Sequence, residues 1–327
     1  MSELHKFIFE GLPVRGALVV LTDAWQEVLR RRAANTQTGA YPPPVAELLG
    51  EMAAAAVLMQ SGIKFDGALV MQIFGDGPVK LAVAEVQSDL RLRATASVTG
   101  AVPPGAMLAE LVNAHGQGRC AITLDPRLRL PGQQPYQGVV PLAGPGGVAL
   151  RGVAEVIEQY MRQSEQLDTT LVLAADGMRA AGLLLQRLPV QGQHNLAQSH
   201  VAREEGAAGD DAFERLSLLA RSLKRDELLE LDADTVLRRL FWQEPLQRFE
   251  PRQGASGPRF ACSCSRERVG AMLKGLGRDE AESILREQGQ VEVSCDFCGQ
   301  QERFDAVDVG RLFTPAAQQP PQPGSVQ

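Results

Sequence analysis

The first 100 residues contain several short runs in which apolar and polar side chains alternate, a pattern typical of half-buried strands. Two such runs flank the turn Gly11-Leu12-Pro13 and predict a hairpin. Three more follow one another, with Gly75-Asp76-Gly77-Pro78 as their first turn, and predict an antiparallel meander. The expected strands cover residues 5–10, 14–21, 68–74, 79–86 and 90–98.

Helical patterns interrupt these strands. A capping residue at Thr22 or Asp23 starts a helix that reaches about residue 34, and Pro42-Pro43-Pro44 starts a second helix, rich in Ala and Leu, over 45–60. This mixed order predicts an α+β core domain over residues 1–190 rather than a doubly wound parallel sheet. The rest of that domain is expected to hold helices at 105–114 and 152–165 and strands at 120–124, 137–142, 169–175 and 178–188.

Composition changes after Pro189. Residues 191–257 hold 21 charged side chains in 67, about 31% against 22% for the whole chain, yet two apolar stripes at helical spacing remain. Asp234 is placed to cap the second stripe. These are either two ordinary surface helices or a metastable linker that must dock on a neighbour, because isolated helices of this length are marginal in water. The stripes consist of Leu216, Leu219, Ala220 and Leu223, and of Val236, Leu237, Leu240 and Phe241.

Charge and hydropathy exclude several classes of protein. The longest apolar stretch, residues 52–59, is far too short to span a bilayer, and the N-terminus lacks the basic and apolar regions of an export signal. We therefore expect a cytoplasmic protein that does not enter the membrane. The net charge of −6 and a pI near 5.4 argue against a nucleic-acid partner.

Four of the five cysteines fall within 37 residues, as a CxC pair and a CxxC pair: Cys262 with Cys264, and Cys295 with Cys298. In a reducing cytosol two close pairs indicate a metal site before they indicate static disulfides, and four thiolates complete a tetrahedral structural zinc. The sequence predicts one Zn²⁺ per chain, held by a small module over residues 258–313. Cys120 stands apart in a strand-like run and is expected to be a small buried hydrophobe.

The sequence motifs that could indicate catalysis are weak, and we expect that this protein is not an enzyme. A CxxC can serve thiol–disulfide exchange, but Val291-Glu292-Val293 predicts a strand before Cys295, not the helix N-terminus that such chemistry uses. The four histidines belong to no recognisable catalytic motif. Gly144-Pro145-Gly146-Gly147-Val148-Ala149 matches a nucleotide fingerprint only loosely. A zinc ribbon for nucleic acid is also disfavoured, since residues 258–316 carry 8 basic and 10 acidic side chains before four thiolates are added.

The paired thiols suggest a switch. If an oxidant converts them to disulfides, the neighbour in each pair is the fastest resolving partner, giving bridges Cys262–Cys264 and Cys295–Cys298 and releasing the metal. Such short loops constrain the chain by only about 2 kcal/mol, whereas a bridge across the 30-residue gap yields about 3.5–4 kcal/mol and keeps the module closed. Local pairing therefore opens the module, and a linker that depends on it should expose apolar surface. The expected client-binding residues are Phe213, Leu216, Leu219, Leu223, Leu237, Leu240, Phe241 and Trp242.

The cysteine segments resemble the zinc module of the 33-kDa redox-regulated heat-shock chaperones. The matching runs are residues 260–269, 291–298 and 304–309, and the resemblance extends into the core domain, covering most of residues 10–312. Two positions depart from the family pattern: Glu302 stands where the family usually has an aromatic residue, and Asp168 follows the Ser-Glu-Gln motif. The core runs that carry the resemblance are Tyr41-Pro42-Pro43-Pro44, Tyr136-Gln137-Gly138-Val139-Val140-Pro141-Leu142 and Gln163-Ser164-Glu165-Gln166-Leu167 with Thr169.

The resemblance implies an ATP-independent holdase that is inactive when reduced and zinc-bound. Oxidation would activate it by unfolding the zinc module and linker, and the active form would dimerise, bind unfolding client proteins and pass them to ATP-driven chaperones. Two alternatives stay open: a zinc-stabilised interaction protein that does not switch, and a thiol–disulfide oxidoreductase. A Pro/Gln-rich tail over residues 314–327 is expected to be disordered.

Overall fold

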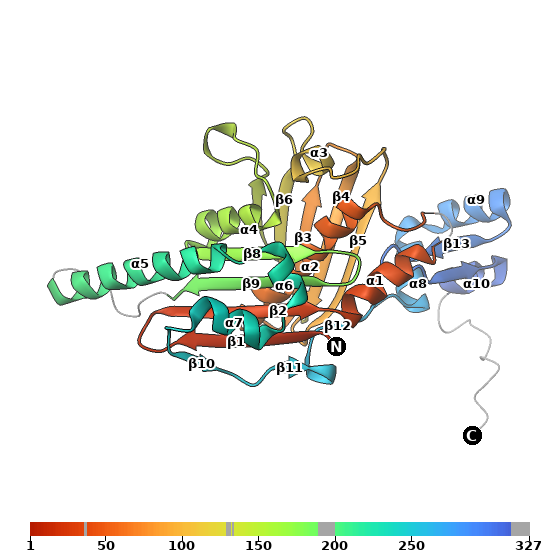
Figure 1. Ribbon diagram of the computed structural model, residues 1–327. Helices are drawn as coiled ribbons and strands as arrows, with labels where there is room; N and C mark the ends of the chain where they lie inside the picture. Colours follow the sequence, from red (N-terminus) through yellow and green to blue (C-terminus); the bar gives the residue numbers. More distant parts are fainter. Residues whose placement is uncertain (36–37, 129–131, 133, 189–199, 315–327) are drawn as a thin grey trace, which may run out of the picture. The chain divides into compact units, whose positions relative to one another are not determined.

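The computed structural model describes residues 1–35, 38–128, 132, 134–188 and 200–314 (Figure 1). The chain divides into two compact units, Met1–Ala261 and Cys262–Gln327, each described by itself below. The start of the expected linker, residues 191–199, and nearly all of the expected tail lie outside the described residues. Within the described ranges, no helix is both long enough and apolar enough to cross a membrane.

Two six-stranded sheets form the framework of the first unit. The first has the strand order β10-β1-β2-β9-β8, with β11 also on β1, and the second has the order β12-β5-β4-β3-β6-β7. All pairings are antiparallel except that of β12 with β5, so the predicted hairpin and meander are confirmed. The strands of the core domain are β1 (Glu3–Phe9), β2 (Val14–Leu21), β3 (Gly67–Phe74), β4 (Val79–Gln87), β5 (Arg91–Val98), β6 (Arg119–Pro126), β7 (Tyr136–Pro141), β8 (Thr169–Ala175) and β9 (Ala180–Arg187).

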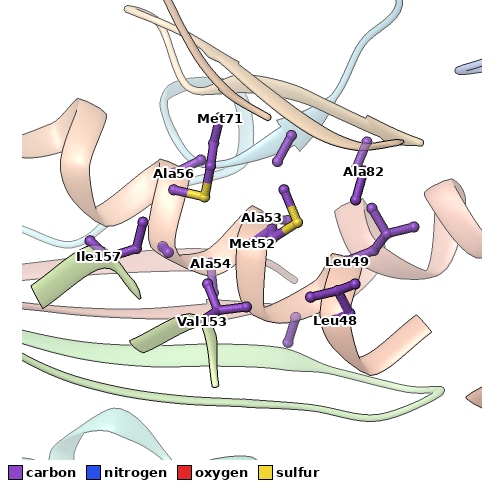
Figure 2. Close-up of a cluster of buried hydrophobic side chains, with 14 of the residues drawn as sticks. Leu48, Leu49, Met52, Ala53, Ala54, Ala56, Met71, Ala82, Val153 and Ile157 are labelled. Carbon is purple, nitrogen blue, oxygen red and sulfur yellow. The ribbon is translucent and has the colours of Figure 1, made fainter. Parts of the chain in front are cut away.

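The helix α2 (Pro43–Gly62) fills the space between the two sheets, as the side chains in Figure 2 illustrate. It contacts strands of both sheets as well as α4, and 15 of its 20 residues are buried. This explains its composition, because a helix covered on all sides has no polar face to present to water. Small side chains allow close approach: a Cβ added at Gly50 would lie 2.4 Å from the Ala175 Cβ.

The remaining core helices are α1 (Asp23–Ala33), α3 (Leu108–Val112) and α4 (Val153–Tyr160). The helix predicted over 152–165 differs in its last turn, where Met161–Glu165 forms a π-helical turn that ends at Gln166 with a φ of +55°. The strand predicted from residue 90 starts one residue later, because Leu90 has a φ of +64° and belongs to the preceding turn. Hydrophobic alternation alone does not reveal either backbone feature.

The charged segment after the core supplies three helices, α5 (His200–Arg221), α6 (Arg225–Glu230) and α7 (Ala233–Phe241). Their described apolar side chains form one cluster with Phe7, Phe9 and other residues of the first sheet, on the face opposite α2. The Phe241 ring stands edge-on to the Phe9 ring, with centroids 5.1 Å apart. The apolar stripes thus dock on the core domain of the first unit. The N-cap of α7 is Asp232, whose carboxylate accepts from the Thr235 N–H (2.9 Å), so the prediction of Asp234 as the cap was wrong.

The same segment also contains strands that the sequence did not predict. β10 (Leu246–Arg248) and β11 (Arg252–Gln253) pair with β1, and β12 (Arg259–Phe260) pairs with β5. Runs of two or three residues are too short to show an alternation, which is why only their pairing in the folded chain identifies them. The expected linker, residues 191–257, is therefore attached to an edge of the first sheet as well as to its face, whereas β12, which lies in the segment expected to form the zinc module, pairs at the edge of the second sheet.

The second unit contains α8 (Arg266–Leu276), α9 (Arg278–Gln288) and α10 (Ala306–Phe313) around the hairpin of β13 (Val291–Ser294) and β14 (Gln301–Phe304). Its buried apolar cluster has five members, Leu273, Ala281, Val291, Phe304 and Val309. A core of this size is small for an independently stable fold, and such domains usually need a metal or disulfides.

Candidate metal centre

The four paired cysteines lie together in the second unit, and their sulfur atoms are all within 4.8 Å of one another. Cys262 Sγ lies 3.6 Å from Cys295 Sγ, and Cys264 Sγ lies 3.2 Å from Cys298 Sγ. Tetrahedral Zn–S bonds of about 2.3 Å require sulfur–sulfur separations of about 3.8 Å, so the observed spacing suits one metal ion. Both of these separations join the first pair to the second, which means that the site brings together segments about 30 residues apart.

The second pair lies on a preformed turn. The β13–β14 hairpin leads into it, the Cys295 N–H donates to the Gln300 carbonyl (2.9 Å), and the Gly299 N–H donates to the Cys295 carbonyl (2.8 Å). Gly299 has a φ of +69°, a conformation that glycine adopts without steric cost. Backbone hydrogen bonds within this turn therefore hold Cys295 and Cys298, which are close in sequence, near each other.

The first pair has less local support. Residues 261–265 form neither helix nor strand, between the end of β12 and the start of α8. The Ser265 hydroxyl caps α8 by accepting from the Arg268 N–H (3.3 Å), and the Arg268 guanidinium donates to the Ser263 hydroxyl (2.6 Å). The serine between the two cysteines is thus held by a side chain of α8 rather than by a turn of its own.

Without a metal, the site disfavours thiolates. Burial, followed by hydrogen bonding to Cys298, raises the pKa of Cys264 to about 12. The hydrogen bond with Cys262, followed by burial, raises the pKa of Cys295 as well. Neighbouring sulfurs cannot all ionise unless a cation balances their charge. This donor set therefore fits a metal ion that binds thiolate.

Glu302 is explained by an ion-pair cluster beside the site. The Arg266 guanidinium lies 3.4 Å from Glu302, 2.6 Å from Asp308, and over the Phe304 ring at 4.2 Å from its centroid. Gln300 Nε2 also donates to Glu302 (2.8 Å). A carboxylate at this position thus joins α8 to the hairpin by charge.

Two other residues noted in the sequence lie in the core domain. Asp168 pairs with Arg187 at 3.5 Å, at the ends of β8 and β9, and so has a structural partner. Cys120 is fully buried on β6, where burial raises the pKa of its thiol to about 12. It therefore has no part in the four-cysteine cluster and no exposed sulfur.

The eight expected client-binding residues are placed on or next to the docked helices. Leu216, Leu223, Leu237, Leu240 and Phe241 are buried against the first sheet, while Phe213 and Leu219 are partly buried there. Trp242 differs, because 72% of its surface is exposed. Seven of the eight side chains are thus covered, fully or partly, in this arrangement.

Comparison with known proteins places this geometry in a family. A family model described as Hsp33 protein matches residues 2–305. The 33 kDa chaperonin of Chromobacterium violaceum is 44% identical to this chain over 315 residues, covering 95% of this chain and 94% of the relative. That of Methylobacillus flagellatus is 40% identical, covering 96% and 94%.

A solved structure supports the fold. The crystal structure of the 33 kDa chaperonin (heat shock protein 33 homolog) of Thermotoga maritima aligns with a TM-score of 0.70 at 20% identity, covering 95% of this chain and 97% of that one. With the family match over nearly the full length and relatives at 40% identity or more, the chain belongs to the Hsp33 family.

Proposed function

We propose that this protein is a redox-regulated, ATP-independent holdase, held inactive while its four paired cysteines are reduced and bind one Zn²⁺. The observation that carries the proposal is the cluster of four sulfurs within 4.8 Å in a unit whose described residues form a buried apolar cluster of five members. When bound, zinc supplies a tetrahedral tie between the CxC and CxxC segments, and four thiolates are a donor set that zinc prefers. The relatives described above are named 33 kDa chaperonin, which supports the proposed chaperone activity.

The oxidation step uses only the thiols and a peroxide. One sulfur of a pair attacks the peroxide oxygen, the O–O bond breaks, and a sulfenic acid and one water form. The neighbouring thiol then displaces the sulfenic oxygen as a second water, leaving a disulfide. Each pair loses two electrons and the peroxide gains them. The proposed bridges are Cys262–Cys264 and Cys295–Cys298, because short loops close fastest once the tie across the module is gone.

The strand β12 offers a route from the cysteines to the linker. It ends two residues before Cys262, and its backbone is held by the Arg259 N–H on the Leu90 carbonyl (3.2 Å) and the Ala261 N–H on the Leu92 carbonyl (3.0 Å). Arg259 also pairs with Asp89 at 3.0 Å. Unfolding of the residues after β12 removes the anchor of a two-residue pairing that is marginal by itself, so we propose that β12 detaches before the linker does.

Linker release would then expose the client-binding surface. The docked helices bury apolar side chains against the first sheet, and both surfaces would become available to exposed apolar segments of unfolding proteins. We further propose that the oxidised form acts as a dimer in the cytoplasm and hands clients to ATP-dependent chaperones, without nucleic acid or membrane partners. In this proposal the protein is not an enzyme.

The proposal is tested by light scattering of a heat-denatured client in the presence of reduced or peroxide-treated protein, with zinc release followed in parallel by a chromogenic chelator. We expect suppression of aggregation only after oxidation, together with zinc release. Equal activity of the two forms would contradict the switch, and loss of activity on oxidation would favour a zinc-stabilised interaction protein.

The β12 route is tested by Arg259→Ala. This variant should become active at lower peroxide or lower temperature than the wild type, because it lacks the ion pair to Asp89. Arg238→Ala is the matched control, since Arg238 lies exposed on α7. If both variants activate as the wild type does, β12 does not limit linker release.

A further inference from the structure

A small apolar cavity of about 90 Å³ lies in the first unit, away from the cysteines, where the C-terminal end of α2 meets both sheets and the π-helical turn. Its volume equals that of about three water molecules at about 30 Å³ each, and it is smaller than the apolar cavity of about 150 Å³ that accepts benzene. The space suits a short aliphatic chain rather than an aromatic ring. The apolar walls include Leu58, Ile63, Leu69, Ile122, Leu124 and Leu184.

The guanidinium of Arg15 lines this cavity without an acidic partner among the residues that the structure describes. Its Nη1 donates to the Gly62 carbonyl (2.9 Å), which caps α2, and Nε donates to Gln186 Oε1 (2.9 Å). Nη2 donates to the same Gln186 oxygen. A guanidinium has five N–H donors, so two of them have no acceptor in the described part of the chain.

Other cations add to the positive charge at this end of α2. Lys6 Nζ donates to the Ser61 carbonyl (2.8 Å), one residue from the carbonyl that Arg15 caps. The pKa of Lys6 is lowered by burial and then by the charges of Arg15 and Arg252. The partial negative charge of a helix C-terminus is about half a unit and does not balance two full cations. Even when the Glu165 carboxylate, which also lines the cavity, is added to the helix-end charge, the two cations leave an excess of about half a positive charge, which favours one anionic group.

The carboxylate of Glu165 also lines the cavity, and its charge is opposite to that of Arg15. This residue is exposed, and its Oε1 accepts from the hydroxyls of Tyr160 (2.8 Å) and Tyr136 (3.3 Å). The π-helical turn and the left-handed Gln166 fix its position. Two sequence runs that the redox switch does not use, 136–142 and 163–167, thus meet at one carboxylate. A fixed negative charge here disfavours any ligand that carries a second anionic group.

We propose that this cavity binds a short aliphatic monocarboxylate, with the carboxylate on Arg15 and the alkyl chain against the apolar wall. A branched four-carbon tail matches the volume, and 3-methylbutanoate is the probe that we would use. No cysteine lines this cavity, so a test of carboxylate binding does not depend on whether the redox proposal is correct.

The first experiment uses the reduced, zinc-bound wild-type chain and calorimetric titration with four compounds. We expect 3-methylbutanoate to bind at least about tenfold more tightly than each of the others, because a hydrogen-bonded charge and the apolar tail each contribute. The comparisons are 3-methylbutan-1-ol, which lacks the charge; acetate, which lacks the tail; and glutarate, which carries a second charge. Equal affinity for the acid and the alcohol, or no heat with 10 mM 3-methylbutanoate at about 100 μM protein, overturns the proposal.

Variants locate the site. Arg15→Gln should weaken binding at least about tenfold, while Arg162→Gln, an exposed arginine of the π-helical turn, should leave it within about twofold. Because Arg15→Gln removes a helix cap and can fail to fold, Ile63→Trp is a second test: Ile63 is 37% exposed at the cavity, and the larger ring should fill the space and abolish binding. Met178→Trp, on an exposed turn, is its control. Unchanged affinity in Ile63→Trp contradicts the assignment.

Discussion

The helix α2 and the cysteine unit show two different ways of holding a chain together. α2 buries 15 of its 20 residues between two sheets, whereas the described part of the second unit has an apolar cluster of five buried residues. Packing against both sheets stabilises α2, whereas the second unit combines a small described core with four sulfur atoms that a single ion could join. Where packing is this limited, a change in the chemistry of the sulfur atoms has the largest effect on whether the chain stays folded.

The largest effect should follow loss of the metal. Cys298→Ser removes one ligand, and the second unit should lose most of the roughly 10–16 kcal/mol that zinc contributes to the folding of such modules. Hydrogen exchange should become fast throughout residues 266–313 and stay slow in α2. Chelation of the wild-type protein should give the same pattern. Slow exchange in α8 or β13 after chelation would show that the unit folds by packing alone.

Two glycine-to-alanine changes test the contrast in packing. Gly50→Ala should lower the free energy of unfolding of the first unit by about 1–3 kcal/mol, because the new Cβ would approach the Ala175 Cβ to 2.4 Å. Gly275 lies on α8, and a Cβ added there would meet no other described residue within 4 Å apart from its chain neighbours and the backbone of its own helix, so Gly275→Ala should stabilise the second unit by about 0.5–1 kcal/mol. Thermal or urea unfolding measures both. Destabilisation by Gly275→Ala would mean that α8 is packed more tightly than described.

A partly buried acid on α2, Glu51, gives a pH-dependent test. Burial, and to a smaller extent the charge of Glu47, raises the pKa of Glu51 from 4.5 to about 7. The charge of Arg225 and a hydrogen bond from the Val153 N–H lower this pKa but do not cancel the effect of burial. The folded chain then binds more protons than the unfolded chain between about pH 4.5 and 7, so this residue's contribution to stability falls as the pH rises through that window. Glu51→Gln should raise the free energy of unfolding by about 1–2 kcal/mol at pH 8 and have little effect at pH 4.5.

The control for this test is Glu10→Gln, at an exposed position of the first hairpin. Urea unfolding at several pH values compares the variants. A gain for Glu51→Gln that is the same at pH 4.5 and pH 8 would indicate a packing effect instead of a titration.

The smallest effect is expected at Cys120. Its thiol is fully buried and has a pKa raised to about 12, so it stays protonated and inaccessible at pH 8. Mass spectrometry after treatment with iodoacetamide should find Cys120 unmodified in the folded chain, while the four clustered cysteines react after chelation. Modification of Cys120 at a similar rate would show that the first unit opens as readily as the second.

Much of this contrast could be predicted from the sequence. Alternation identified the strands of the core, the proline run identified the start of α2, and the spacing of four cysteines identified the metal centre. These signals are local, because each depends on residues close together in the chain. The docking surface of the linker was not predictable in the same way, since the apolar stripe around Leu216 and Phe241 matches any apolar face.

The short strands and backbone turns were missed for a related reason. β12 consists of Arg259 and Phe260, and its pairing with Arg91 and Leu92 joins positions about 170 residues apart. The left-handed Leu90 and Gln166 are ordinary residues whose conformation is set by surrounding contacts, not by their own preference. The cavity beside Arg15 likewise depends on where both sheets and a π-helical turn meet.

The turn at Gly299 also bears on the kinetics of metal exchange. Because the hydrogen bonds of Cys295 and Gly299 are made within the hairpin, this half keeps its two sulfurs at chelating separation before an ion arrives. The half with Cys262 has to be brought in from an irregular segment and pays its ordering entropy on each binding event. If the cluster binds a metal ion, Cys295 and Cys298 would therefore be the better prepared pair of ligands, and the ordering of Cys262 and Cys264 would limit binding.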